Sequence, residues 1–522
     1  MRFVINGITL PIESTSESLT IKIAKETRLE PKRFSYEIIK KSIDARKGEV
    51  NFVYSVIVET SSFINGRNIK PYIEPLPIRI PKSTLKYRPV IVGFGPAGIF
   101  ASLILARSGA KPIIIERGKD VEKRSLDIKR LQEESILDPE SNVCYGEGGA
   151  GTFSDGKLNT GVNSPLTKFV LEEFWKHGAK KDILTDALPH IGSDYLRKIV
   201  KGFREEIISL GGEVLFESKL EDIRYDSKGL QEVIYSNSGS LHVLETDTLI
   251  LAFGHSPYLT VKKLYDRGLF ITPKDFSIGV RIEHLQKSIN LTRYHGFAED
   301  NRLPAASYKC VTHLDNGRAV YSFCMCPGGY VMNSSTELES VVTNGMSNNG
   351  RDNINGNAAL LVPIKIADYF SSSPLDGFLF REKIERSAYQ KEKPYFAPIQ
   401  LVKDFLNDES STKLGNVTPS YKPGVYFSSL GNHLPSFIGS SLKEGIAALA
   451  KQLSFMGDQD AILTGFETRS SSPVRIPRDV SLQANIKGIY PCGEGASYAG
   501  GITSASLDGI KVALKILGAD SV

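Results

Sequence analysis

The chain has 522 residues, of which 41% are hydrophobic and 24% charged, and its formal net charge is +5. This length exceeds what one hydrophobic core usually serves, so we expect two or three domains. The small net charge argues against a general nucleic-acid-binding surface, and five scattered cysteines fit a reducing cytoplasm better than a disulfide framework.

Residues 1–85 predict a small α+β module. Two β-rich runs, "RFVINGITLPI" (2–12) and "VNFVYSVIVET" (50–60), predict strands. Between them, "FSYEIIKKSIDARKG" (34–48) predicts a helix with Phe34, Ile38 and Ala45 facing inward. The first run alternates like a strand and lacks the apolar core of a signal peptide, which agrees with a cytoplasmic location.

The same module carries a mild basic bias. Residues 22–49 hold nine Lys or Arg against five Asp or Glu. This bias is compatible with RNA or an acidic partner, but a solvated helix face is the simpler expectation. A proline-rich run, "PYIEPLPIRIPKS" (71–83), then predicts a linker.

The longest uncharged apolar stretch, "VIVGFGPAGIFASLILA" (90–106), resembles a membrane span at first sight. It is short for one, and three glycines and a proline interrupt it. Strand, turn and helix is the better interpretation, so we predict no membrane segment.

Residues 86–275 predict the first part of a Rossmann-like domain. The run "RPVIV" predicts a buried parallel strand, and the G-x-G-x-x-G turn "GFGPAG" follows it. In this motif Gly93 permits the tight turn, Gly95 with Pro96 and Ala97 lets a pyrophosphate approach the backbone, and Gly98 allows close helix packing. A second strand, "KPIIIE", ends on Glu116, which is positioned to accept hydrogen bonds from ribose hydroxyls.

Two basic residues follow this strand. Arg117 and Arg124 lie in "RGKDVEKRSLDIKR". Either could contact a cofactor phosphate, and either could be a charge on a helix surface.

Two later segments favour FAD over NAD. "TDTLILAFGHSP" (246–257) predicts a buried strand and a small-residue turn containing Ala252 and Gly254. "GIYPCGEGASYAGGITSASLDGIKVALKIL" (488–517) predicts a strand, an acidic glycine turn and a helix. At this point the sequence resembles two-dinucleotide-type FAD oxidoreductases. The resemblance implies that Gly493 and Glu494 lie at the ribityl chain, and that the helix beginning at Gly501, Ile502 and Thr503 faces the flavin ring.

Further strings resemble a narrower family. They are "YGEGGAGTFSDGKLNTG" (145–161), "YSFCMCPGG" (321–329), "VVTNGMS" (341–347), "ETRSSSPVRIPRD" (467–479) and "PCGEGASYAGGITSA" (491–505). Together they resemble an uncharacterised bacterial family usually described as FAD-dependent dehydrogenases. This resemblance covers almost the whole chain; it implies FAD binding and leaves the substrate open.

The first of these strings is a glycine-rich loop. We expect its backbone amides and hydroxyl groups to run beside the pyrophosphate and the flavin ring. Lys157 is a catalytic candidate that could stabilise reduced flavin or hold an anionic substrate, or be a solvated residue of a surface turn. The candidate cofactor-binding residues of the loop are Gly149, Ala150, Gly151, Thr152, Ser154, Gly156 and Lys157.

Other candidates are weaker. His255 follows a cofactor-type turn and is a second catalytic candidate, although a lone histidine is more often structural. Cys324 and Cys326 would lie on one strand face with Cα atoms roughly 7 Å apart, too far for an unstrained disulfide. We therefore expect them to be small packing residues rather than a redox pair, and we expect the same of Cys144 and Cys492, which flank the cofactor motifs; a flavin-reducing disulfide is the alternative.

Three arginines precede the last cofactor segment. Arg469, Arg475 and Arg478 could bind a carboxylate or phosphate, or be solvated charges on a linker. No C-x-x-C pair and no H-E-x-x-H motif occurs in the sequence, so no metal site is predicted.

Residues 276–466 predict a substrate domain inserted into the cofactor domain, which resumes over 467–522. Helices are expected at "FREKIERSAYQ" (380–390) and "SFIGSSLKEGIAALAKQLSFM" (436–456). The run "TNGMSNNGRDNINGN" (343–357) predicts a long polar loop, either a lid or mobile surface.

The predicted protein is an α/β, FAD-dependent oxidoreductase acting at flavin N5 on a small molecule. A reduced nicotinamide, if used, would visit transiently, because no second dinucleotide motif of good context occurs; a different donor or direct oxidation of the substrate is equally open. Two alternatives remain open: a flavin-dependent RNA-modifying enzyme, and a redox sensor or scaffold with a structural FAD. The sequence does not predict the substrate or the oligomeric state.

Overall fold

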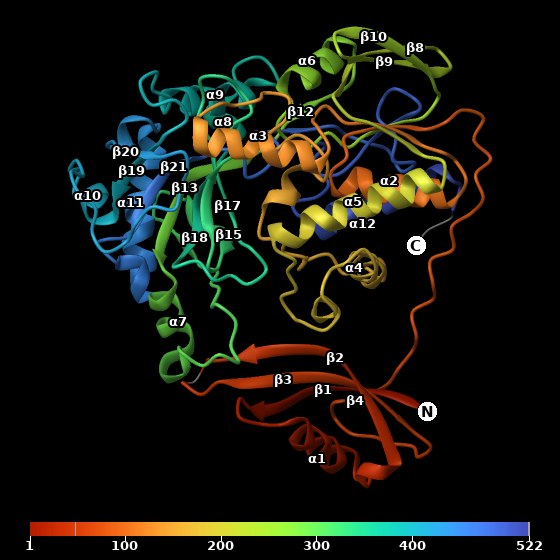
Figure 1. Cartoon of the computed structure of the whole chain (residues 1–522), viewed down its shortest axis with the longest axis vertical. Coiled ribbons are helices and arrows are strands. Elements are labelled where there is room, and N and C mark those ends of the chain that lie inside the picture. Colours follow the sequence, from red (N-terminus) through yellow and green to blue (C-terminus); the bar gives the residue numbers. More distant parts are fainter. Residues whose placement is uncertain (47, 520–522) are drawn as a thin grey trace.

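The computed structural model describes residues 1–46 and 48–519 (Figure 1). It confirms the predicted fold class. A parallel, Rossmann-like sheet with helices lies beside a large mixed sheet formed by residues 276–467, and a small α+β module precedes both.

The N-terminal module is an antiparallel sheet with one long helix. Helix α1 (Ser16–Thr27) begins at a capping box on Thr15 and packs Leu19 and Ile23 against one face of the sheet. The strands, in spatial order, are β2 (Phe34–Asp44), β3 (Asn51–Thr60), β1 (Arg2–Pro11) and β4 (Ile69–Pro71).

The predicted helix over 34–48 is wrong, because residues 34–44 form strand β2. Phe34, Tyr36 and Ile38 lie at alternate positions and pack on the α1 side. A bulge after Ile38 then shifts the phase, and Ile43 packs on the opposite side. Each half of the strand has a period of two, but the phase shift makes the whole run look helical.

The opposite face of the module docks on the rest of the molecule. Ile12, Val50 and Phe52 belong to the same hydrophobic cluster as the large mixed sheet. The backbone of Lys41 also exchanges hydrogen bonds with Thr185 and Ala187. Figure 1 shows the consequence: α1 lies on the outer side of the module, away from the other domains.

The cofactor-type domain is built on a five-stranded parallel sheet. One face is covered by α2 (Pro96–Arg107), α5 (Ser193–Ser209) and α12 (Ile502–Ile516), which pack against Ile91 and Ile114. The strands, in spatial order, are β23 (Ile489–Pro491), β11 (Leu249–Leu251), β5 (Val90–Val92), β6 (Ile113–Ile115) and β7 (Glu213–Leu215).

The other face of the parallel sheet carries a second layer. Val90 and Val92 alternate with Ile91 and pack against an antiparallel sheet and a helix, so β5 is buried on both faces. This layer comprises β8 (Ser218–Asp226), β9 (Gly229–Asn237), β10 (Ser240–Glu245) and α6 (Tyr258–Asp266). Two further helices of the domain are α3 (Val121–Glu134) and α4 (Leu166–Lys176).

Residues 276–467 form a seven-stranded sheet whose centre is β13. The strands, in spatial order, are β14 (Val311–His313), β15 (Ala319–Cys326), β18 (Asn355–Ile364), β13 (Phe276–Leu285), β21 (Ile462–Glu467), β19 (Ala397–Leu401) and β20 (Val425–Phe427). Its helices are α7 (Gln286–Tyr294), α8 (Ile366–Tyr369), α9 (Asp376–Ser387), α10 (Val402–Leu406) and α11 (Ser436–Ala450).

The predicted polar loop over 343–357 is wrong as a lid. Residues 343–346 form β17 (Thr343–Met346), which pairs with β16 (Tyr330–Asn333), and β18 begins at Asn355. Only a short connection remains, and Asn349 anchors it by accepting from His190 and donating to Ile191. The polar composition of this run suggested a loop. In the structure, however, its polar residues form hydrogen bonds inside the protein.

A short antiparallel pair, β12 (Thr272–Pro273) with β22 (Val474–Arg475), lies where the chain enters and leaves the mixed sheet. Among the described residues, no helix has both the length and the apolar character needed to cross a bilayer.

Candidate functional site

The first glycine turn joins β5 to α2 at the carboxyl end of the parallel sheet. Gly93 has a φ of +98°, and a Cβ there would lie 2.4 Å from the carbonyl oxygen of Ala252. A Cβ on Gly98 would lie 1.9 Å from the Gly93 oxygen, so only glycine allows this close packing. A Cβ on Gly95 would meet only the Gly149 Cα, at 3.8 Å, so space stays open before the helix N-terminus.

A cavity of about 230 Å³ connects this turn with the mixed sheet. It is lined by the carboxyl ends of β5, β6 and β11, by the N-termini of α2 and α12, and by parts of β15 and β21. The sequence-predicted site residues that line it are Gly93, Gly95, Pro96, Ala97, Glu116, Arg117, Gly149, Ala150, Gly151, Ser154, Ala252, Gly254, His255, Glu494, Gly501 and Ile502.

Other predicted residues lie behind the residues that line the cavity. The hydroxyl of Thr152 donates to the Glu147 carbonyl at 3.1 Å, and that of Thr503 donates to the Leu158 carbonyl at 2.6 Å. Neither hydroxyl is therefore directed to a ligand. The predicted residues that support the wall without lining the cavity are Gly98, Arg124, Thr152, Gly156, Lys157, Gly493 and Thr503.

Arg124 needs a correction, because it is neither a phosphate ligand nor a surface charge. Its side chain is fully buried. It donates to the carbonyl oxygens of Asn142, Val143, Glu147 and Gly149 over 2.6–2.9 Å. Arg124 therefore shapes the glycine-rich loop from inside the protein.

Glu116 ties the two glycine-rich segments together. Its carboxylate accepts backbone amides of Phe94 at 2.8 Å, Gly118 at 2.9 Å and Gly146 at 2.8 Å. A carboxylate offers about four acceptor sites, so one remains for a ribose hydroxyl, and that contact stays a prediction. The neighbouring Arg117 lines the cavity, where its guanidinium lies 3.9 Å from the centre of the Tyr145 ring.

Lys157 does not reach into the cavity. Its Nζ donates to the Met325 carbonyl and lies 3.8 Å from Asp155 Oδ2. Asp155 is paired in turn with Arg351 at 2.6 Å. The lysine therefore contributes positive charge behind the wall, next to strand β15.

His255 lines the cavity as a neutral side chain. Burial, with the nearby guanidinium groups of Arg381 and Arg469, lowers its pKa to about 3. Its Nε2 lies 4.0 Å from Glu494 Oε1, and burial raises the pKa of Glu494 to about 7. An uncharged imidazole beside a carboxyl group that titrates near neutral pH can relay a proton.

The three arginines near the last cofactor segment have separate positions. Arg469 is buried in the cavity wall and pairs with Glu385. Arg478 pairs with Asp508 at 2.6 Å, and Arg475 stacks over Tyr498 with a centroid distance of 4.9 Å. Only Arg469 is therefore placed to face a ligand.

Sequence reasoning missed Glu467, the last residue of β21. It lines the cavity, is only 3% exposed, and its Oε2 has no hydrogen-bond partner among the described residues. The nearest positive atom is Nη1 of Arg281, at 3.6 Å. Burial raises the pKa of Glu467 to about 7, and Arg281 opposes that shift. The available signal was an acid closing an apolar strand, "ILTGFE".

The other missed residues come from several elements. Tyr145 and Phe323 add aromatic surface to the cavity, while Asn344 adds an amide. Burial raises the pKa of Tyr145 to about 12, and its hydroxyl has no hydrogen-bond partner in the part of the chain described here. Only Cys144, of the pair Cys144 and Cys492, lines the cavity, and both are free thiols.

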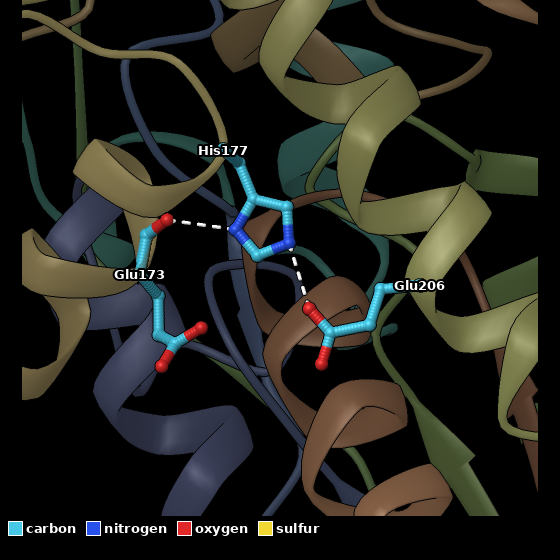
Figure 2. Close-up of side chains that lie close together, drawn as sticks. All are labelled: Glu173, His177 and Glu206. Atoms are coloured by element: carbon cyan, nitrogen blue, oxygen red, sulfur yellow. Dashed lines mark hydrogen bonds and ion pairs between the residues drawn. The ribbon is translucent and has the colours of Figure 1, made fainter.

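One acidic cluster outside the cavity has metal-like geometry. Glu173, His177 and Glu206 bring ligand atoms within 4.8 Å of one another (Figure 2). His177 Nδ1 faces the Glu173 carbonyl at 2.7 Å, and Nε2 faces Glu206 at 2.9 Å.

Cations of the protein already neutralise this cluster. Arg107 bonds Glu173 at 2.7 Å and Glu206 at 2.7 Å, and Lys176 bonds Glu173 at 2.9 Å. The His177 ring stacks on Phe203 with centroids 3.9 Å apart. We interpret the cluster as an ion-pair network that joins α4, α5 and α2.

The cavity fits a dinucleotide. The backbone space at Gly95 lies before a helix N-terminus, where a pyrophosphate is stabilised. The second helix N-terminus, at Gly500, Gly501 and Ile502, reaches the same cavity. Tyr145 and Glu467 line the cavity too, and within residues 1–46 and 48–519 the Tyr145 hydroxyl and Glu467 Oε2 find no hydrogen-bond partner, so polar groups remain for a ligand to satisfy. Fold and site together define a Rossmann-like protein of the FAD-binding class.

Comparisons with known proteins identify the family. The family described as "FAD-dependent protein, C-terminal domain-like" matches residues 275–470, and a domain of unknown function matches residues 3–59. A protein of Clostridium beijerinckii, described as "Uncharacterized protein", is 43% identical over 530 residues, covering 99% of each chain. The chain belongs to the same family as this relative, and the cofactor of this chain is FAD.

Solved structures resemble the chain only distantly. The flavin-dependent halogenase CmlS is 14% identical with a TM-score of 0.39, covering 84% of this chain and 59% of that one. Glycine oxidase from Bacillus cereus is 12% identical with a TM-score of 0.34, covering 84% and 96%. These values support no statement about activity.

Proposed function

We propose that this protein is a cytoplasmic FAD-dependent oxidoreductase that passes a hydride or an electron pair between FAD and a small-molecule substrate. One observation carries the proposal: the glycine turn of β5 and α2 shares a single cavity with Glu467, Arg469 and Asn344. Residues that hold a dinucleotide therefore face polar residues suited to a substrate. When bound, FAD supplies hydride or electron transfer at its N5 atom.

The two helix N-termini are proposed to bind different parts of the cofactor. The N-terminus of α2, with Gly93 and Gly95, holds the pyrophosphate. The N-terminus of α12, with Gly501 and Ile502, faces the ring, where its dipole favours the negative charge of the reduced state.

Glu467 is the proposed proton carrier. The residue lines the cavity, its Oε2 has no hydrogen-bond partner among the described residues, and its pKa of about 7 lets it hold or release a proton near neutral pH. Hydride transfer to or from carbon commonly requires such a partner for the accompanying proton. Glu494, beside His255, is the second carboxyl group suited to this task.

Arg469 favours an anionic substrate. It pairs with Glu385, and Arg381, which donates to the His255 carbonyl, adds a second positive charge near this carboxylate. Arg469 Nε and Nη2 bond Glu385, and Nη1 bonds Thr336, so further N–H groups remain for a ligand. A carboxylate or phosphate on the substrate would complete this network.

The test is an anaerobic titration of the purified holoprotein with NADH and NADPH, followed by visible absorbance. We expect the flavin band to bleach with at least one of them, because a reduced nicotinamide is the proposed transient donor. If neither donor bleaches it, the nicotinamide step is wrong. If purified protein and added FAD do not combine, the whole proposal fails.

A further inference from the structure

Strand β15 carries a bulge at its two cysteines. Phe323 pairs with Ala359 of β18, and the next pair is Cys326 with Asn357. Three residue steps of β15 therefore oppose two steps of β18, and one residue is extra. Cys324, inside the bulge, has a φ of +42°, which a non-glycine residue adopts only under constraint.

The bulge overturns the spacing expected for a regular strand. Two steps of β18 span roughly 7 Å, so the three opposing steps of β15 advance only about 2.3 Å each. The Cα atoms of Cys324 and Cys326 are therefore closer together than the roughly 7 Å of a flat strand, and a disulfide requires a Cα separation of about 4.4–6.8 Å. The sequence-based argument against pairing assumed a flat strand.

The two thiols differ in exposure. Cys324 lines the cavity, whereas Cys326 is fully buried behind it. The Cys326 thiol donates to the Cys324 carbonyl at 3.3 Å and lies 3.7 Å from Nη2 of Arg281. The Cys324 side chain can therefore meet a ligand in the cavity, whereas Cys326 lies buried beside it.

Charged groups on four segments surround the pair. Lys157 and Arg281 are positive, while Asp155, Glu467 and Glu494 are negative. A hydrogen bond with Cys326, followed by Lys157 and Arg281, lowers the pKa of Cys324 and outweighs burial and Asp155. The pKa of Cys326 is raised well above its usual value by the same hydrogen bond. Cys324 is therefore the thiolate that attacks, and Cys326 is the partner that stays protonated.

We propose that Cys324 and Cys326 are a redox-active dithiol that exchanges two electrons with FAD in the cavity. Oxidation forms one bond between the two sulfurs and breaks the S–H bond of Cys326. The two electrons and that proton reduce FAD, and the reverse transfer reopens the disulfide as one thiolate and one thiol. This inference rests on the proposed function, since it needs FAD in the cavity.

The test is the electron capacity of the holoprotein. After mild oxidation with ferricyanide, the protein is titrated anaerobically with dithionite. The wild type should accept about four electrons per FAD, because a disulfide and a flavin each take two. Cys324→Ser and Cys326→Ser should accept about two. Cys310→Ala, which removes a buried thiol outside the cavity, should match the wild type.

Two outcomes would overturn the proposal: a wild type that accepts about two electrons, or cysteine variants that accept four. A second readout does not depend on FAD. Apoprotein oxidised with ferricyanide should lose about two mass units in the peptide that contains both cysteines, and neither serine variant should do so. A thiol pair that stays fully alkylatable after oxidation contradicts the inference. Loss of FAD binding alone contradicts the proposed function instead.

Discussion

Arg469 and Glu385 form a bidentate ion pair inside the cavity wall. Nε of Arg469 lies 2.9 Å from Oε1 of Glu385, and Nη2 lies 2.6 Å from Oε2. Their side chains are 6% and 1% exposed. The pair joins helix α9 to the segment that follows β21, so it sets the position of a cavity-lining residue across two elements.

Breaking this pair should destabilise the protein strongly. Arg469→Ala leaves the Glu385 carboxylate buried without its partner, and we expect the free energy of unfolding to fall by about 3–5 kcal/mol. Urea unfolding of the apoprotein measures it. The double variant Arg469→Met with Glu385→Gln should recover part of the loss, because the carboxylate is neutralised together with its partner. A single variant that costs under about 1 kcal/mol would show that the pair does not act as described.

Gly95→Val should abolish FAD binding without unfolding the protein. A Cβ at this position meets only one backbone atom, at 3.8 Å, so the fold accommodates it. The added methyl groups occupy the space before the α2 N-terminus that the pyrophosphate needs. Flavin absorbance per protein measures the effect. Gly161→Val, at an exposed site with open space around it, is the matched control and should keep its flavin. A Gly95→Val protein with full flavin would contradict the site.

Glu467→Gln should change how stability depends on pH. The folded-state pKa of about 7 exceeds the usual 4.5, so the folded state binds the proton more tightly. The contribution is therefore present below pH 4.5 and is lost as pH rises through 7. Glutamine mimics the protonated acid, so at pH 8 the apoprotein variant should be more stable by up to about 3 kcal/mol.

Urea unfolding at pH 4.5 and pH 8 checks this sign, since the gain should vanish at the lower pH. Glu133→Gln, which changes an exposed glutamate of α3, serves as the control and should show no such dependence. Equal stability of Glu467→Gln and wild type at both pH values would show that Glu467 is not held in an environment that favours its neutral form.

The Glu173, His177 and Glu206 cluster should not depend on a metal ion. Every carboxylate oxygen and ring nitrogen in it already has a protein partner. We expect EDTA or added Zn²⁺ to leave the melting temperature unchanged. Arg107→Gln, by contrast, removes the cation between two carboxylates and should cost about 3 kcal/mol or more. A melting temperature that falls with EDTA would identify a metal site instead.

Local spacing in the sequence was enough to predict the nucleotide-binding unit. The strand before Gly93, the turn and helix α2 form from neighbouring residues, and close contacts within that unit or with the adjacent strand require Gly93 and Gly98. Gly95, and Gly501 at the start of α12, instead leave open space before a helix N-terminus. Local spacing misled us at residues 34–44, where a bulge after Ile38 shifts the alternation of a strand and imitates a helix.

The sequence by itself determined the fold class and the glycine-rich half of the cavity, because those features depend on short-range backbone geometry, and its resemblance to FAD-dependent families indicated the cofactor. Only the tertiary structure determined which residues form the other half of the cavity. Glu467, Arg469 and Cys324 reach the cavity from strands and turns whose neighbours in space are distant in the chain. The pKa values of Cys324 and Glu467 are set by burial and by nearby charges such as Arg281. Neither can be inferred from the residues next to them in the sequence.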